Sequence, residues 1–196
     1  MSFFGIQESK LETKIKEVFS NPPTLETKRL FLVKIGQEHA HDMFRYSSDP
    51  DVTKYLTWSC HSSLNQTQRH IKFLEKKYKS GVFNDWGIVE KLSGRMIGTC
   101  GFTAFDEKEN MAEIGYVLAK DMWGKGYAKE SADRVMQFAR EVFGLDSFCA
   151  KCIEGNNASI SVMKKCGLTE LVGVYKNSMY IKGEYKTIVV YRTPAK

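Results

Sequence analysis

The sequence predicts one α/β domain in which helices cover a mixed β-sheet. Segments with the alternation of strands and segments with the spacing of helices follow one another along the 196 residues, which favours this class. Three strand-like runs within residues 85–118 are separated only by short turns, as in an antiparallel meander. With 42% hydrophobic residues and no internal repeat or long linker, the chain can bury one substantial core.

Each expected strand is an apolar run bounded by polar turn residues. The strands cover residues 29–35, 85–91, 96–105, 111–118, 147–153, 171–181 and 185–192. Helices are expected where apolar residues recur every three to four positions, and glycine or proline marks several of their ends. The helices cover residues 8–19, about 37–48, 64–81, 127–143 and 156–166. We therefore expect a helical N-terminal extension, residues 1–24, ahead of a main domain, residues 25–196.

The charge and the cysteines limit the classes of partner. Lysine and arginine number 29 against 23 acidic residues, and the net charge of +6 favours anionic partners. The basic residues are scattered, without an arginine-rich run, so nucleic-acid binding is not predicted. No stretch reaches membrane-spanning length, and five cysteines without a secretory signal indicate reduced thiols in the cytoplasm. Cys149 and Cys152 lie three apart on a predicted strand and face opposite sides, so no metal site is expected.

A glycine-containing loop, Trp123 to Ala128, leads into the longest of the later helices. A Walker A loop requires four residues between its glycines, whereas Gly124 and Gly126 are two apart and Tyr127 follows them. A dinucleotide-binding fingerprint requires a third glycine where this sequence has Lys129. What remains is a row of backbone N–H groups at the positive end of a helix. This arrangement suits a pyrophosphate.

Three motifs, in this order and spacing, resemble the GNAT N-acetyltransferase superfamily, especially its RimJ/RimL-type branch of ribosomal-protein N-acetyltransferases. The motifs are AEIGYVL (112–118), WGKGYAKES (123–131) and NNASISVMKKCGL (156–168). The resemblance extends over about residues 25–191. It implies a seven-stranded, mixed but mostly antiparallel sheet with splayed central strands and flanking helices. It also implies acetyl-CoA-dependent transfer of an acetyl group to a primary amine by direct attack in a ternary complex.

The same resemblance implies which residues would hold acetyl-CoA. The family's loop pattern, Gln/Arg-x-x-Gly-x-Gly/Ala, is matched by Gly126 and Ala128, while Trp123 departs from it. Backbone at the end of the 111–118 strand would pair with the pantetheine, and the start of the last helix would lie beside it. The residues expected at the cofactor are Val117, Leu118, Trp123, Gly124, Lys125, Gly126, Tyr127, Ala128, Asn156 and Ser159.

Glu113 is expected to be the general base, because it is a carboxylate within an otherwise apolar strand. It shares a strand face with Gly115, which would leave open space for an acceptor or a relaying water. A solvated glutamate beside a turn fits the residues alone equally well, and the resemblance favours the catalytic role. The family also implies a backbone N–H near Val117 as the oxyanion donor.

The general acid is less well defined by the sequence. Many family members have a tyrosine where this chain has Met163. Ser159, which is also a candidate catalytic residue, or Tyr116 is left as the alternative donor. A strong acid is also dispensable in principle, because a thiol with a pKa of about 8.5 leaves readily as a thiolate.

Residues 49–58 are expected to be irregular and aromatic. The acceptor pocket is expected from the segment at 52–61, with Tyr55, Trp58 and His61, and from the final hairpin around Tyr180. For His61 a surface role is favoured over a catalytic one. The acceptor is either a protein N-terminal α-amino group or a small amine. Two alternatives to an enzyme stay open: an acyl-CoA-binding sensor of the same fold without transfer activity, and a basic RNA- or ribosome-binding protein. The N-terminal helix either covers the pocket, pairs with a second subunit in a homodimer, or does neither.

Overall fold

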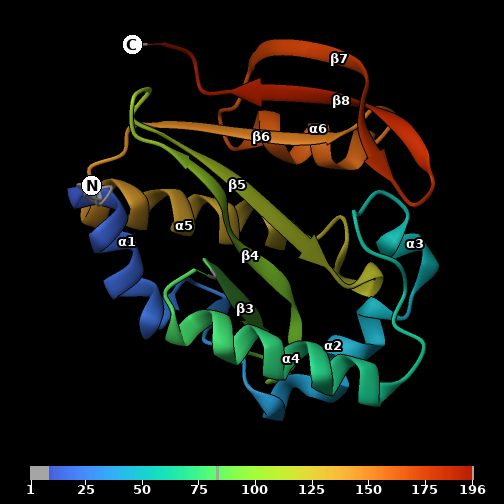
Figure 1. The fold of residues 1–196 in the computed structure, drawn as a ribbon. Coiled ribbons are helices and arrows are strands. Elements are labelled where there is room, and N and C mark those ends of the chain that lie inside the picture. Colours follow the sequence, from blue (N-terminus) through green and yellow to red (C-terminus); the bar gives the residue numbers. More distant parts are fainter. Residues whose placement is uncertain (1–8, 83, 196) are drawn as a thin grey trace, which may run out of the picture.

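In the computed structural model, which describes residues 9–82 and 84–195, one mixed sheet of eight strands is flanked by helices (Figure 1). The strand order is β1-β2-β3-β4-β5-β6-β8-β7, and every neighbouring pair is antiparallel except β5–β6. The strands are β1 (Leu25–Glu26), β2 (Leu30–Val33), β3 (Asp85–Glu90), β4 (Met96–Asp106), β5 (Met111–Leu118), β6 (Ser147–Ile153), β7 (Glu170–Ile181) and β8 (Glu184–Arg192). The predicted class is confirmed. The sheet has one strand more than expected, because β1 is only two residues long and shows no alternation in the sequence.

The helices agree with the expected ones except around residue 50. They are α1 (Lys10–Ser20), α2 (Ala40–Ser47), α3 (Pro50–Thr53), α4 (Leu64–Lys79), α5 (Tyr127–Phe143) and α6 (Asn157–Lys165), with 3₁₀ turns at Gln37–His39 and Lys120–Met122. The segment after residue 48 was expected to be irregular, but Asp49 caps the short helix α3 and Pro50 is its first residue. Within the described residues, none of the helices has the length and apolar character needed to cross a membrane.

Helix α1 packs into the hydrophobic core. Phe19 is completely buried, and its ring lies 5.0 Å from that of Trp86 on β3 in an edge-to-face contact. Trp86 in turn contacts Phe138 of α5, with ring centroids 5.4 Å apart. The helix predicted within residues 1–24 is therefore joined to the sheet by aromatic packing. Glu8, the first residue of that prediction, lies outside the described part of the chain.

The two central parallel strands separate after a short contact. β5 and β6 pair only through Met111–Glu113 and Ser147–Cys149, and beyond these residues the strands diverge. Helix α5, which connects them, packs on the face of the sheet that carries Trp86 of β3 and Phe102 of β4. Figure 1 shows α5 behind β5 and α4 in front of the sheet. The splayed central strands that the resemblance implied are present, and they open the sheet next to the start of α5.

Candidate active site

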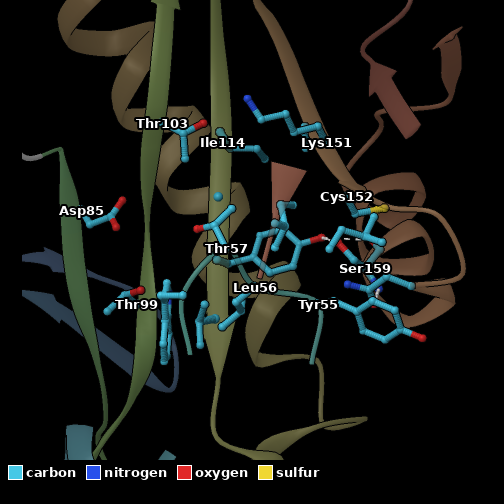
Figure 2. Close-up of a pocket in the computed structure, with 18 of the residues that line it drawn as sticks. Tyr55, Leu56, Thr57, Asp85, Thr99, Thr103, Ile114, Lys151, Cys152 and Ser159 are labelled. Atoms are coloured by element: carbon cyan, nitrogen blue, oxygen red, sulfur yellow. Dashed lines mark hydrogen bonds between the residues drawn. The ribbon is translucent and has the colours of Figure 1, made fainter. Parts of the chain in front are cut away.

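A cavity of about 460 Å³ occupies the gap between β5 and β6 (Figure 2). Consecutive β5 residues from Glu113 to Val117 all line it, although Glu113 and Tyr116 belong to opposite faces of the strand. Both faces can contribute because β6 no longer pairs with β5 at this point. The cavity therefore extends through the sheet, with one part of its wall on each side.

Glu113 lies in the cavity wall, held by two polar partners. Its carboxylate accepts a short hydrogen bond from the Thr103 hydroxyl and forms an ion pair with Lys151 of β6 at 3.0 Å. Only 15% of the Glu113 side chain is exposed, against 42% of the Lys151 side chain. Figure 2 shows Thr103 and Lys151 at the same end of the cavity.

Thr103 reaches Glu113 because β4 has a bulge there. The pairing of β4 with β5 shifts between Phe102 and Ala104, which leaves Thr103 without a partner residue. A Cβ added at Gly115 would lie 2.8 Å from the Thr103 methyl carbon. The space that Gly115 was expected to leave open is thus partly filled by Thr103.

A pair of hydroxyl groups spans the gap on the other side of the sheet. The Tyr116 hydroxyl lies 3.0 Å from the Ser159 carbonyl oxygen and 3.1 Å from Ser159 Oγ. Asn156 accepts a hydrogen bond from the Ser159 N–H at 3.2 Å and so caps α6. Burial raises the pKa of Tyr116 well above its usual value, so the phenol stays protonated. Met163 also lines the cavity and lies one helical turn after Ser159 on α6.

The predicted cofactor loop presents its backbone outward at the start of α5. Gly124 and Gly126 have φ values of 74° and 82°, in the left-handed region that other residues rarely adopt. In the described part of the chain, the backbone N–H groups from Gly124 to Lys129 donate no hydrogen bond. Trp123 is 45% exposed, and its ring N–H donates to the Leu118 carbonyl at 2.9 Å. A row of unpaired donors at a helix N-terminus fits an anion such as a pyrophosphate.

The turn between β1 and β2 holds the loop in place. Arg29 Nη1 donates to the Lys125 carbonyl at 2.9 Å, and its guanidinium lies 4.2 Å from the centre of the Tyr127 ring. Glu130, in the first turn of α5, accepts hydrogen bonds from Thr27 and from Arg29. The Tyr127 side chain is buried and its hydroxyl donates a short hydrogen bond to Glu90. Lys125 and Tyr127 can therefore contribute backbone N–H groups, while the side chain of Tyr127 stabilises the loop.

The predicted acceptor residues divide into two groups. Tyr55, Trp58 and His61, all from the segment at 52–61, line the cavity. Tyr180 does not line it, is 64% exposed and packs against Tyr185 with ring centroids 5.1 Å apart. The cause is strand alternation: its neighbours Met179 and Ile181 face the cavity, so Tyr180 points the other way.

His61 is engaged through one ring nitrogen. Its Nδ1 lies 3.0 Å from Ser47 Oγ and 2.8 Å from Thr67 Oγ1. Burial lowers the pKa of His61, and that of His70 beside it is lowered by burial and by His61. Both imidazoles are therefore neutral at pH 7.

Several wall residues were missed by the sequence analysis. Asp85, Thr99, Thr103, Lys151 and Cys152 line the cavity, and Figure 2 labels all five. The one available signal was Asp85, an acidic residue that opens the apolar strand β3. Burial raises the pKa of Asp85 to about 7. In the described residues, no group of histidine, cysteine, aspartate and glutamate side chains could hold a metal ion.

A sheet opened between parallel central strands, beside a helix end that presents free N–H groups, defines an acyltransferase of the GNAT class. The chain belongs to this family: residues 29–169 match the description "Acetyltransferase (GNAT) domain". It is 32% identical over 168 residues to an uncharacterized N-acetyltransferase, p20, of Bacillus licheniformis, covering 86% of this chain and 93% of that protein.

Two solved structures illustrate the shared fold. One is a putative ribosomal-protein-serine acetyltransferase from Vibrio cholerae, with a TM-score of 0.77 and 20% identity over 89% of this chain and 98% of that one. The other is the microcin C7 self-immunity acetyltransferase MccE in complex with acetyl-CoA and AMP, with a TM-score of 0.76 and 19% identity over 86% and 94% of the two chains. The predicted superfamily is confirmed, and the fold is shared with ribosomal-protein acetyltransferases of the Rim type.

Proposed function

We propose that this chain transfers an acetyl group from acetyl-CoA to a primary amine by direct attack in a ternary complex. The observation that carries the proposal is the cavity through the sheet, which has Glu113 on one side and the Tyr116–Ser159 hydroxyl pair on the other. An acceptor and an acyl donor could then meet in the gap without a covalent enzyme intermediate.

The chain offers three groups of contacts for acetyl-CoA. The N–H groups from Gly124 to Lys129 would hold the pyrophosphate, and Asn156 and Ser159 would lie along the pantetheine. The free edge of β5 would supply backbone pairing. Ala119 N–H donates to Ile97 of β4 at 2.8 Å, so the alternation of an antiparallel pair directs the N–H groups of Tyr116 and Leu118 toward the gap.

Acetyl-CoA would supply the activated thioester, and side chains of the protein would accept and donate the protons. Glu113 would take the proton of the attacking amine through a water molecule, because Thr103 and Lys151 already occupy part of its surroundings. The backbone N–H of Tyr116 or Leu118, the two neighbours of Val117 on β5, would stabilise the oxyanion. The Tyr116 hydroxyl, kept protonated by burial, would be the donor to the departing thiolate.

The size of the cavity favours a small amine as the acceptor. Its volume of about 460 Å³ lies in the range of small-molecule sites. An α-amino group with a pKa near 8 is roughly a tenth neutral at pH 7, whereas an aliphatic ammonium near 10.4 is under ~0.1% neutral, a difference of about 3 kcal/mol. A protein N-terminus would therefore require less of the base, and both acceptor classes belong in the test.

The test is thiol release from acetyl-CoA with a panel of amines and N-terminal peptides, comparing wild type with Glu113→Gln. We expect the variant to bind CoA normally and to lose about 100-fold or more in kcat, the usual size of a general-base effect. Glu109→Gln, an exposed glutamate in the turn before β5, is the matched control and should keep the wild-type rate. Near wild-type turnover by Glu113→Gln across the pH range would remove Glu113 from the mechanism. CoA binding without turnover over the whole panel would support the sensor alternative.

A further inference from the structure

Two facing glycines make a floor without side chains across the acceptor side of the sheet. Asp85 of β3 pairs with Gly101 of β4, and Gly101 pairs with Gly115 of β5. All three residues point to the same face, which also carries Glu113. Because Gly101 and Gly115 have no side chains, neither residue places a side chain between the Asp85 carboxylate and β5, the strand that bears Glu113.

The Asp85 carboxylate lies over Gly101 and toward the cavity. A Cβ added at Gly101 would come within 2.3 Å of Asp85 Oδ1. Asp85 is half-buried and lines the cavity, and Figure 2 shows it on the same side as Thr99 and Thr103. The absence of a side chain at Gly101 therefore leaves the room that the Asp85 carboxylate occupies.

Among the described residues, no positive charge balances Asp85 in the cavity. Lys151 is paired with Glu113 at 3.0 Å, and burial keeps His61 and His70 neutral at pH 7. Within residues 9–82 and 84–195, the Asp85 carboxylate has no hydrogen bond or ion pair, since only its backbone carbonyl accepts, from Tyr78. The neighbouring phenols of Tyr46 and Tyr78 have raised pKa values, caused first by burial, and stay uncharged.

We propose that Asp85 binds a second, positively charged group of the acceptor, so that the substrate class is a diamine or another amine with a separate cation. This inference rests on the proposed function and specifies its substrate. The backbones of β3 and β5 are about 10 Å apart, two strand spacings, and the carboxylate leans inward across part of that distance. A flexible aliphatic diamine can then place one ammonium at Asp85 and its other nitrogen at β5.

The direct test is calorimetric binding to the CoA-loaded protein of the four-carbon diamine putrescine and the four-carbon monoamine n-butylamine. The wild type should bind putrescine at least tenfold more tightly than n-butylamine, and Asp85→Asn should lose this preference. Asp51→Asn is the control for a general field effect, because Asp51 is exposed, pairs with Lys120 and lies outside the cavity wall. Thermal unfolding of each variant shows that it is folded.

The pH dependence provides a second measurement. Burial raises the pKa of Asp85 to about 7, so the carboxylate is mostly neutral below pH 6 and charged above pH 8. The putrescine preference should therefore grow as pH rises through 7 in the wild type and stay flat in Asp85→Asn. His61 and His70 face the same space, but burial lowers their pKa values, away from the rise expected through pH 7.

Parallel thiol-release assays separate this inference from the proposed function. The role of Asp85 would be overturned by any of three results: the wild type binds the two amines with equal affinity, it binds neither amine, or the preference for putrescine survives in Asp85→Asn. Acetylation of both amines without preference would overturn it while leaving the proposed function intact. An Asp85-dependent preference without acetyl transfer to any amine would leave the subsite and overturn the proposed function.

Discussion

Replacing Glu130 by alanine is expected to loosen the cofactor loop as well as to destabilise the fold. The Glu130 carboxylate accepts hydrogen bonds from Thr27 Oγ1 at 2.6 Å, the Arg29 N–H at 2.8 Å and Arg29 Nε at 2.6 Å. The same arginine donates to the Lys125 carbonyl and stacks on Tyr127. Glu130 therefore holds Arg29 in place, and Arg29 holds the loop.

The expected loss follows from these contacts. A hydrogen bond to a charged group contributes about 1.5–3 kcal/mol. The Arg29 side chain is 40% exposed, so solvent weakens its share of the three. We expect Glu130→Ala to lower the free energy of unfolding by about 3 kcal/mol and Tm by roughly 6–12 °C for a chain of this length. CoA affinity should fall by about tenfold, because the loop N–H groups would be less preorganised.

Urea unfolding and calorimetric titration with CoA measure the two effects. A double-mutant cycle with Arg29→Ala should give a coupling free energy of about 1–2 kcal/mol. Asp133→Ala, which removes an exposed pair with Lys129 on the same helix, is the control and should cost under about 0.5 kcal/mol. Strict additivity of the Glu130 and Arg29 losses, or unchanged CoA affinity in both variants, would refute the reasoning.

The contact between Glu130 and Arg29 also predicts that the stability of the fold depends on pH. Burial alone would raise the pKa of Glu130, but the hydrogen bonds from Thr27 and Arg29 outweigh burial and lower it. The stabilisation is therefore complete above the unfolded pKa of about 4.3 and is lost as pH falls through the lower folded value. Acid unfolding of Glu130→Gln should be less steep than that of the wild type, as followed by circular dichroism at a series of pH values.

Three further predictions concern the loop, the acid and the core. Gly126→Ala and Gly144→Ala, at the two ends of α5 with left-handed φ values of 82° and 70°, should each lose about 1 kcal/mol of stability, but only Gly126→Ala should weaken CoA binding in a titration. Tyr116→Phe should lower kcat by less than about tenfold, because a thiol with a pKa near 8.5 leaves readily; a 1000-fold loss in steady-state assays would make the phenol indispensable. Phe19→Ala should destabilise by about 3–5 kcal/mol in urea, against under about 1 kcal/mol for the exposed Phe31→Ala, and equal losses would contradict the packing of α1 into the core.

Local patterns were enough to predict the elements that carry the proposed cofactor contacts. Helix α5 was predicted because apolar residues recur along one face and Gly144 ends it. The loop that precedes the helix was identified from the spacing of Gly124 and Gly126. Helix α3 was missed although Asp49 and Pro50 are an ordinary cap and first residue, because it is a single turn without periodicity. Strand β1 was missed for the same reason.

The cavity depends on contacts between distant segments, which local patterns do not contain. The Tyr116 hydroxyl meets Ser159, 43 positions later, only because β5 and β6 separate. Thr103 reaches Glu113 through a bulge that shifts the strand pairing. Asp85 enters the site because Gly101 lies beside it across β3 and β4. Tyr180 was placed in the wall from its aromatic character, whereas the register of β7 turns Met179 and Ile181 inward instead.

The floor made by Gly101 and Gly115 restricts how this pocket can change during evolution. A Cβ at Gly101 would lie 2.1 Å from the Asn84 backbone oxygen, so no side chain can be added there without moving a strand. The residues of α2 and of the segment from Tyr55 to His61 form the opposite wall and lie outside the sheet. Substitutions in α2 and in the segment from Tyr55 to His61 should therefore change which acceptor is preferred, while the sheet residues proposed to act in acetyl transfer stay the same.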